Sequence, residues 1–195
     1  MNKDLTAIIL AGGKSSRFGS DKALAMFQGK TLIQHAVDIV SPVTSNIIIS
    51  ANTHAYDFLN HKVVADIYKD AGPMGGLHAA LSQSNTSTNL VITTDTPFLK
   101  SELYTHLLNQ RNSEQITLAA SADHFVHPLC GIYSASSLIQ IQQFLDKKTF
   151  KMMQLVKSCT LSIININPEL DFFTPELFDN FNRPQDLNKD YKLYD

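Results

Sequence analysis

The chain has little of the positive charge that nucleic-acid-binding proteins carry. Its 195 residues include 16 Lys and Arg against 18 Asp and Glu, which gives a net charge of −2. The longest run of basic residues is the pair Lys147-Lys148. Binding a polyanionic backbone depends on clustered positive charge. Nucleic acid is therefore not an expected partner.

Cysteine and long apolar runs are also scarce. The two cysteines, Cys130 and Cys159, lack C-x-x-C spacing, and one pair in a chain of this length gives no disulfide framework. We expect both thiols to be reduced and buried. The first apolar run, residues 5–11, is too short to span a bilayer and leads into glycines rather than a cleavage site. We therefore expect a cytoplasmic protein with no membrane partner.

Internal repeats, Pro-rich linkers and low-complexity tracts are absent from the sequence as well. Hydrophobic residues make up 44% and charged residues 17%, which is an ordinary globular composition. The length is sufficient for one sizeable core. We expect residues 1–195 to form a single domain.

Short β-branched runs alternate with segments of helical periodicity, which predicts βα units on a mostly parallel sheet. In the first half we expect strands at 5–10, 46–50, 63–65 and 90–94, with helices at 31–40, 75–83 and 101–109. In the less regular second half we expect strands at 116–120, 129–133 and 160–165, with helices at 136–145 and 152–157. The expected fold class is α/β, a three-layer Rossmann-like arrangement.

A glycine-rich turn with three cations follows the first expected strand. Gly12 and Gly13 allow the backbone to approach a phosphate closely, and Lys14, Arg17 and Lys22 supply counter-charge. Open α/β sheets bind ligands at the carboxyl ends of their strands, where this turn lies. The alternative is a charged surface loop, but the position and charge of the turn favour a nucleotide phosphate site.

Two familiar phosphate-binding motifs do not fit this turn. A P-loop ending at Gly13-Lys14-Ser15 would need its first glycine at Ile8, inside the expected strand. The dinucleotide fingerprint fails because the next glycine, Gly19, has the wrong spacing. The turn therefore belongs to a different class of nucleotide site.

A carboxylate ends the fourth expected strand. Asp95 follows a buried run and precedes Pro97, so it should lie at the same sheet edge as Gly12, near Lys22. One aspartate binds Mg²⁺ weakly alone, but a triphosphate brings further oxygens. The alternative is that Asp95 caps the helix expected from Ser101.

Polar residues also end the second and third expected strands, at Asn52 and Asp66. The carboxylate of Asp66 can accept hydrogen bonds from both N1–H and the 2-amino group of a guanine. Asn52 and Asp66 can equally be turn formers. Gly72-Pro73 and the glycines at 75 and 76 form either a plain turn or a helix start that favours an anion.

These segments resemble those of sugar-phosphate and cofactor nucleotidyltransferases. Leu-Ala-Gly-Gly-x-Ser-x-Arg-x-Gly-x-Asp-Lys at 10–22 is similar to their signature loop, with Phe18 in place of the usual Met. Asp-Thr-Pro-Phe at 95–98 and the ending Phe-x-Asn-x-Asn-x-Pro-x-Asp-Leu at 178–187 resemble the molybdenum cofactor guanylyltransferase family. Asn182 in that ending serves either a substrate or the cap of a helix containing Pro184.

The resemblance implies a nucleotidyltransferase fold, an activity and a set of site residues. The activity is transfer of GMP from GTP to molybdenum-molybdopterin, with Mg²⁺ as cofactor and molybdoenzymes or their chaperones as recipients. His127-Pro128 would border the acceptor side, and Ser50 stands where the family often has asparagine, so Asn52 would replace that contact. The implied binding residues are Leu10, Ala11 and Gly12 for base and ribose; Gly13, Arg17 and Lys22 for the triphosphate; Asp66 for the base; and Asp95 for the metal.

Two other functions fit the same residues. One is a nucleotidyltransferase that uses CTP or a sugar phosphate. The other is a non-catalytic nucleotide-binding protein that delivers the cofactor. All three share one geometric requirement, which is that Lys22 and Asp95 lie at the same edge of the sheet.

Overall fold

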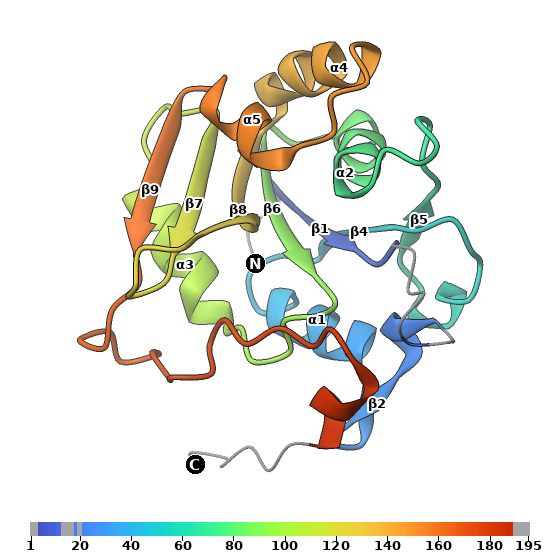
Figure 1. Cartoon of the computed structure of the whole chain (residues 1–195), viewed down its shortest axis with the longest axis vertical. Coiled ribbons are helices and arrows are strands. Elements are labelled where there is room, and N and C mark those ends of the chain that lie inside the picture. The colour runs from blue at the N-terminus through green and yellow to red at the C-terminus, as the bar shows by residue number, and fades with distance from the viewer. Residues whose placement is uncertain (1–3, 13–17, 19–20, 189–195) are drawn as a thin grey trace.

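The structure, a computed structural model, describes residues 4–12, 18 and 21–188. Its centre is a seven-stranded sheet in the order β5-β4-β1-β6-β8-β7-β9 (Figure 1). The strands are β1 (Leu5–Leu10), β4 (Asn46–Ser50), β5 (Lys62–Val64), β6 (Thr88–Thr93), β7 (Ile116–Ala120), β8 (Val126–Ser134) and β9 (Leu161–Asn165). The helices are α1 (Leu32–Val40), α2 (Pro73–Ser82), α3 (Ser101–Gln110), α4 (Leu138–Asp146) and α5 (Met152–Lys157).

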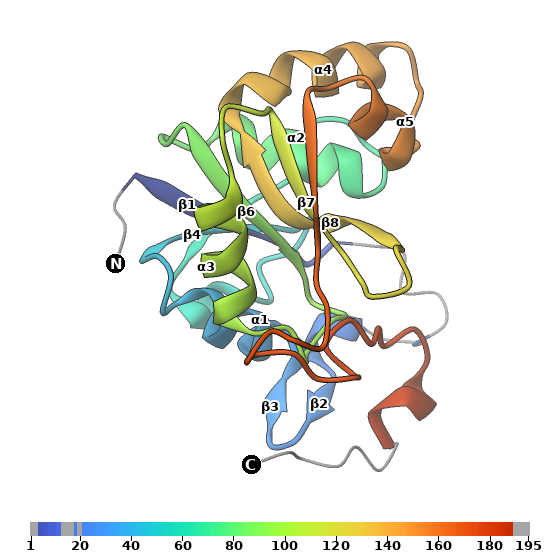
Figure 2. The ribbon, with the colours of Figure 1, turned by 90° about the vertical axis from the view of Figure 1, so that its left-hand side faces the viewer.

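The helices form a layer on each face of the sheet. Helices α2, α4 and α5 lie on one face, and α1 and α3 on the other (Figures 1 and 2). Strand β1 shows why, because its side chains alternate between two cores. Ile9 packs in the cluster that contains Ile33 of α1, whereas Ile8 packs with Leu77 of α2. The expected three-layer α/β fold with a mostly parallel sheet is confirmed.

One strand runs against the others. Strand β8 pairs antiparallel with both β6 and β7, whereas the remaining four pairings of the sheet are parallel. Ala120 at the end of β7 pairs with Val126 at the start of β8. The beginning of β8, including His127, therefore lies at the edge where β1 and β6 end.

Helix boundaries follow local capping chemistry. Thr31 forms a capping box with Gln34, so α1 begins one residue after the expected start. The expected start of α2 at residue 75 is wrong, because Pro73 occupies its first position and Gly72 before it has a φ of 60°. The proline supplies a pre-set φ, and the glycine tolerates the left-handed backbone.

A short hairpin of β2 (Met26–Phe27) and β3 (Lys30–Thr31) was not expected from the sequence. Its turn has Gln28 and Gly29 at positive φ, 47° and 80°. Phe27 packs edge-on against Phe98 and Phe181, at centroid distances of 5.6 and 4.9 Å. The hairpin therefore joins the segment after β6 to the C-terminal segment.

Both cysteines are free; Cys130 is buried as expected, but Cys159 is only partly buried. No helix in the described part of the chain combines the length and apolarity that a membrane span requires.

Candidate active site

The carboxyl ends of the parallel strands converge on one edge of the sheet. Beyond the regular ladders, the amide of Ala11 donates to the carbonyl of Ser50 at 3.0 Å, and that of Ala51 donates to Val64 at 2.9 Å. These bonds extend β1 and β4 by one residue. The glycine-rich turn therefore leaves the sheet beside the ends of β4 and β5.

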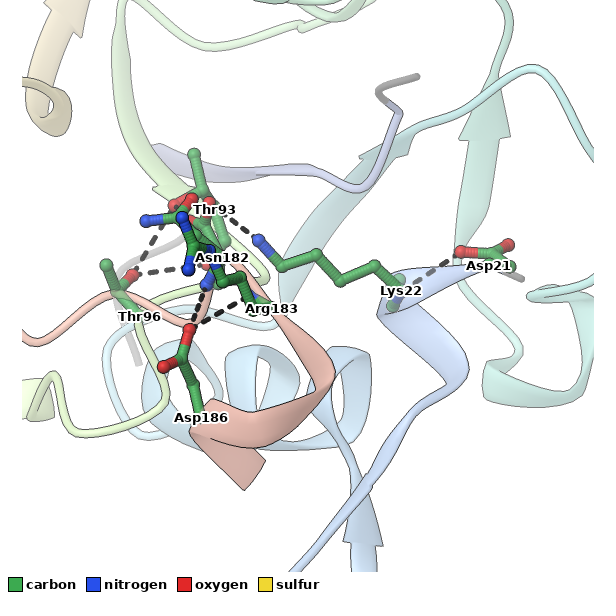
Figure 3. Close-up of polar contacts among 9 residues, drawn as sticks. Asp21, Lys22, Thr93, Thr96, Asn182, Arg183 and Asp186 are labelled. Carbon is green, nitrogen blue, oxygen red and sulfur yellow. Dashed lines mark hydrogen bonds and ion pairs between the residues drawn. The ribbon is translucent and has the colours of Figure 1, made fainter. Parts of the chain in front are cut away.

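Lys22 and Asp95 meet at this edge. The Nζ atom of Lys22 lies 3.1 Å from Oδ2 of Asp95, and the two side chains are 16% and 26% exposed. Figure 3 shows the Lys22 side chain extended toward the end of β6. The two residues are 73 positions apart in sequence. The geometric requirement stated from the sequence is therefore met.

Asp95 is held through both its carboxylate and its backbone carbonyl. Thr93 donates its hydroxyl to Oδ1 of Asp95 at 2.5 Å, and the amide of Phe181 donates to the Asp95 carbonyl at 2.8 Å. Asp95 does not cap α3, because Lys100 occupies the N-cap position. Thr93 was not predicted as a site residue, although its position two residues before the carboxylate was a usable signal.

Lys22 is fixed through the residue that precedes it. Asp21 is the N-cap of the short 3₁₀ helix η1 (Lys22–Leu24), and its Oδ1 accepts from the amide of Ala23 at 3.0 Å. Its Oδ2 accepts from the hydroxyl of Tyr56 at 2.6 Å. Figure 3 shows Asp21 on the far side of the Lys22 backbone from the ion pair. Neither Asp21 nor Tyr56 received a role from the sequence.

A second group of predicted residues surrounds Gly76 of α2. A methyl group added at Gly76 would lie 2.5 Å from Oγ of Ser50, 3.4 Å from Oδ1 of Asp66 and 3.5 Å from Cδ2 of Leu10. The glycine therefore leaves the space in which these three side chains converge. The structure brings Leu10 and Asp66 together as the nucleotide hypothesis requires.

Asn52 and Asp66 form a reciprocal pair. The Asn52 amide nitrogen donates to Oδ2 of Asp66 at 3.0 Å, and the Asp66 backbone amide donates to Oδ1 of Asn52 at 2.9 Å. Ser50 is 2% exposed, whereas Asn52 is exposed. Asn52 thus holds the orientation of the Asp66 carboxylate.

The C-terminal segment crosses the site beside Asp95. In this segment the carboxylate of Asp186 accepts from the backbone amides of Asn182 and Arg183, at 2.8 and 2.9 Å. Asp186, rather than Asn182, therefore supplies the capping side chain of this turn. The bond from the amide of Phe181 to the carbonyl of Asp95 places Asn182 next to the end of β6, the region drawn in Figure 3.

His127 lies in a row of aromatic rings at the same edge. Its ring stacks on Phe178 at 4.2 Å with an interplanar angle of 8°, and it contacts Phe125 edge-on at 5.1 Å. Its Nε2 atom lies 3.2 Å from Oγ of Ser121. Burial lowers the pKa of His127 below its usual value, and the charge of Asp123 partly opposes that shift.

The donors near Asp95 suit a metal that arrives with phosphate oxygens. Within residues 4–12, 18 and 21–188, no group of three or more His, Cys, Asp or Glu is placed to hold an ion. One partly exposed carboxylate is what a Mg²⁺ site contributes when waters and a substrate phosphate complete the octahedron. Asp95 fits that role.

The predicted site residues now have definite positions. Lys22 and Asp95 are in contact, and Leu10, Asp66 and Asn52 gather around Gly76. Ala11 and Gly12 continue β1 toward that corner, and Gly12 lies against the backbone of Ser50 and Ala51. The predictions for Gly13, Lys14 and Arg17 lie outside the described residues.

A glycine-rich sequence after β1 and a cation–carboxylate pair at the carboxyl edge of a three-layer α/β sheet are the features expected of a nucleotidyltransferase. The model of the MobA-like NTP transferase domain matches residues 7–160. A Flavobacterium johnsoniae protein named "Probable molybdenum cofactor guanylyltransferase" is 35% identical over 94% of this chain and 95% of its own length. The Vibrio campbellii molybdenum cofactor guanylyltransferase is 33% identical over 92% and 91%.

A solved structure shares the fold. Molybdopterin-guanine dinucleotide biosynthesis protein A from Archaeoglobus fulgidus superposes with a TM-score of 0.78 at 23% identity, covering 94% of this chain and 95% of that one. The chain belongs to the MobA-like NTP transferase domain family and is a nucleotidyltransferase. Members of this family usually use a divalent metal ion.

Proposed function

We propose that this enzyme transfers GMP from GTP to the terminal phosphate of molybdenum-molybdopterin, with Mg²⁺ as cofactor. The products are the guanine dinucleotide form of the cofactor and pyrophosphate. The observation that carries the proposal is the contact of Lys22 with Asp95 at 3.1 Å, at the same edge of the sheet as the corner formed by Leu10 and Asp66. The names of the relatives from Flavobacterium johnsoniae and Vibrio campbellii support guanine as the base.

Asp66 is the residue that we assign to the base. A guanine presents N1–H and a 2-amino group side by side, and one carboxylate can accept both. The reciprocal bonds with Asn52 leave Oδ1 of Asp66 directed toward the Gly76 corner. Charge-assisted hydrogen bonds of this kind contribute about 1.5–3 kcal/mol each. A cytosine has no matching pair of donors, so the same carboxylate would disfavour CTP.

Lys22 and Asp95 act on the triphosphate in the proposed reaction. A terminal oxygen of the acceptor phosphate attacks the α-phosphorus of GTP, the bond from that phosphorus to the bridging oxygen breaks, and pyrophosphate leaves with the electron pair. Lys22 neutralises charge on the triphosphate, with Arg17 assigned to the same task. Because the acceptor phosphate is already ionised, no general base is needed.

Asp95 would hold Mg²⁺, which when bound neutralises charge on the α-phosphate and the leaving pyrophosphate. Lys22 can serve the nucleotide only if it leaves Asp95 or shares it, so ligand binding rearranges this ion pair. Asn182 and Arg183 directly follow Phe181, whose amide donates to the carbonyl of Asp95. We assign them and His127 to the acceptor phosphate.

Pyrophosphate release tests the proposal. The protein is incubated with Mg²⁺ and molybdenum-molybdopterin, and GTP and CTP are supplied in turn. We expect release with GTP and at least a tenfold lower kcat/KM with CTP, the scale of one lost charge-assisted hydrogen bond. Preference for CTP would replace the guanine assignment, and absence of release with either nucleotide would favour a non-catalytic delivery protein.

A further inference from the structure

Tyr56 is a buried residue with a polar contact that the proposed reaction does not yet use. It is remote in sequence from Lys22 and Asp95, and the residue is 1% exposed. The ring packs in the core cluster under α1 and β4. Its hydroxyl, however, points to the two ends of the glycine-rich segment. Because that segment carries the nucleotide in the proposed function, these contacts bear on catalysis.

The hydroxyl of Tyr56 bridges those two ends. It donates to Oδ2 of Asp21 at 2.6 Å and lies 3.4 Å from the carbonyl oxygen of Ala11. Because the hydroxyl has one proton, it donates mainly to the carboxylate of Asp21, which is nearer and charged. Ala11 is the residue at which the chain leaves β1, and Asp21 is the residue at which it enters η1. A single buried group therefore fixes the separation of the points where the segment starts and ends.

The contact continues from Asp21 to the ammonium group that acts on substrate. Both carboxylate oxygens of Asp21 are engaged, one by Tyr56 and the other by the amide of Ala23 in η1. Lys22 is the first residue of that helix, and its Nζ reaches Asp95. A shift of Asp21 would therefore move Lys22 relative to the end of β6.

Burial, and then the hydrogen bond to Asp21, raise the pKa of Tyr56 well above its usual range. The hydroxyl therefore keeps its proton and remains a donor at neutral pH. Because the Tyr56 ring is packed in the core, its hydroxyl is held in one position. A surface side chain would be free to change its position.

We propose that Tyr56 is a positioning residue for the phosphate-binding lysine: its hydroxyl, acting through Asp21, sets where Lys22 meets the triphosphate. The inference rests on the proposed role of Lys22. Tyr56 touches neither substrate nor metal, so its contribution is to alignment. Small misplacements of an electrostatic group lower turnover strongly, because the group acts on charge that develops in the transition state.

The test compares two buried tyrosines that lose the same atom. Tyr56→Phe removes the bridging hydroxyl, and Tyr104→Phe removes a hydroxyl that donates to the carbonyl of Val91 at 3.1 Å. We measure pyrophosphate release with GTP, Mg²⁺ and molybdenum-molybdopterin, calorimetric binding of GTP, and thermal unfolding. We expect kcat/KM to fall about tenfold in Tyr56→Phe, mainly through kcat, and less than about twofold in Tyr104→Phe. Equal falls in the two variants would overturn the proposal.

A second comparison tests the route through Asp21. Asp21→Ala removes both the acceptor of the Tyr56 hydroxyl and the cap of η1. If the proposal is correct, adding Tyr56→Phe to Asp21→Ala changes kcat/KM by less than about twofold, because the hydroxyl then has no carboxylate through which to act. A full further tenfold loss would refute the route.

The proposed role of Lys22 is tested separately, by measuring the turnover of the variant Lys22→Met. If that variant keeps wild-type turnover, the assignment of Lys22 itself fails, whatever Tyr56→Phe does. If Lys22→Met loses turnover and Tyr56→Phe does not, only the positioning role fails.

Discussion

Replacing the two partners of the Lys22–Asp95 ion pair should change the affinity for metal-free GTP in opposite directions. In the free enzyme the lysine is neutralised by the carboxylate, so a triphosphate must compete with Asp95 for it. Asp95→Ala removes that competitor and also the repulsion between the carboxylate and the phosphates. We therefore expect Asp95→Ala to bind metal-free GTP more tightly than the wild type, even though it loses turnover.

The magnitude follows from the geometry of the pair. At 3.1 Å, two unit charges attract by about 1.3 kcal/mol at the dielectric constant of water and about 5 kcal/mol at an effective value of 20. Exposed pairs contribute about 0.2–1 kcal/mol in double-mutant cycles. The side chains are 16% and 26% exposed, so a value of about 1–2 kcal/mol is expected. Releasing Lys22 from this pair would tighten metal-free GTP binding about 5- to 30-fold.

The assay is calorimetric titration of GTP, first in the presence of a chelator and then with saturating Mg²⁺. Asp95→Ala should gain affinity in the chelator and lose the increase that Mg²⁺ gives the wild type. Its kcat for pyrophosphate release should fall about 10²- to 10³-fold, the scale for removing one preorganised electrostatic group. Lys22→Met should bind GTP more weakly in both conditions.

Asp38→Ala is the matched control, because Asp38 forms an ion pair with Lys30 in which both side chains are more than half exposed. It should change neither titration. Weaker metal-free binding by Asp95→Ala would refute the reasoning, since the carboxylate would then be assisting the nucleotide without a metal.

Three further predictions concern specificity and stability. Gly76→Ala should weaken GTP binding several-fold and lower the free energy of unfolding by about 1 kcal/mol, as measured by titration and urea unfolding. Overpacking against Ser50 costs about 1–3 kcal/mol, and the higher helix propensity of alanine offsets about 1 kcal/mol of that. His127→Gln should reduce the loss of stability between about pH 7 and pH 5, because a His pKa that is lower in the folded state means that the unfolded chain binds the proton first as pH falls; urea midpoints at both pH values check this. Thr31→Ala should cost about 1 kcal/mol through the lost capping box with Gln34, without a change in kcat/KM.

The placement of Lys22 and Asp95 at the same edge of the sheet could be predicted from strand direction. Both residues follow buried strands, and parallel neighbours end at the same edge. The first strand, the strand ending at Ser50 and the helix ending at Lys157 have the expected bounds, since each is a compact apolar run with a clear stop signal. Local sequence patterns are sufficient to predict the bounds of a strand or helix when those bounds do not depend on the rest of the fold.

The reversed strand β8 could not be predicted in the same way. Its expected start at residue 129 is wrong, because β8 begins at Val126 and includes Pro128, which lacks an amide proton. The structure accommodates the proline beside an irregularity in the ladder between β7 and β8. Strand direction depends on the pairing partner, and no local signal in the sequence recorded that partner.

The C-terminal segment was recognisable by its motif but not by its position. Phe181 lies beside Asp95 because its ring fills the space between Phe27 and Phe98, and those contacts join three regions that are remote in sequence. Tyr56 was missed for a related reason. Its ring is ordinary core, and only the three-dimensional structure shows that its hydroxyl reaches Asp21.

If the proposed function is correct, the ion pair predicts that metal and nucleotide bind cooperatively. In the proposed reaction Mg²⁺ takes the carboxylate of Asp95, and GTP takes the ammonium group of Lys22. The ligand that binds first must separate Lys22 from Asp95, which costs free energy. The second ligand then binds without that cost. Coupling of this kind is reciprocal, so Mg²⁺ must raise the affinity for GTP by the same factor as GTP raises the affinity for Mg²⁺. Because Asp95 is a single carboxylate and Lys22 is already paired with it, we expect each ligand to bind weakly at this edge of the sheet without the other.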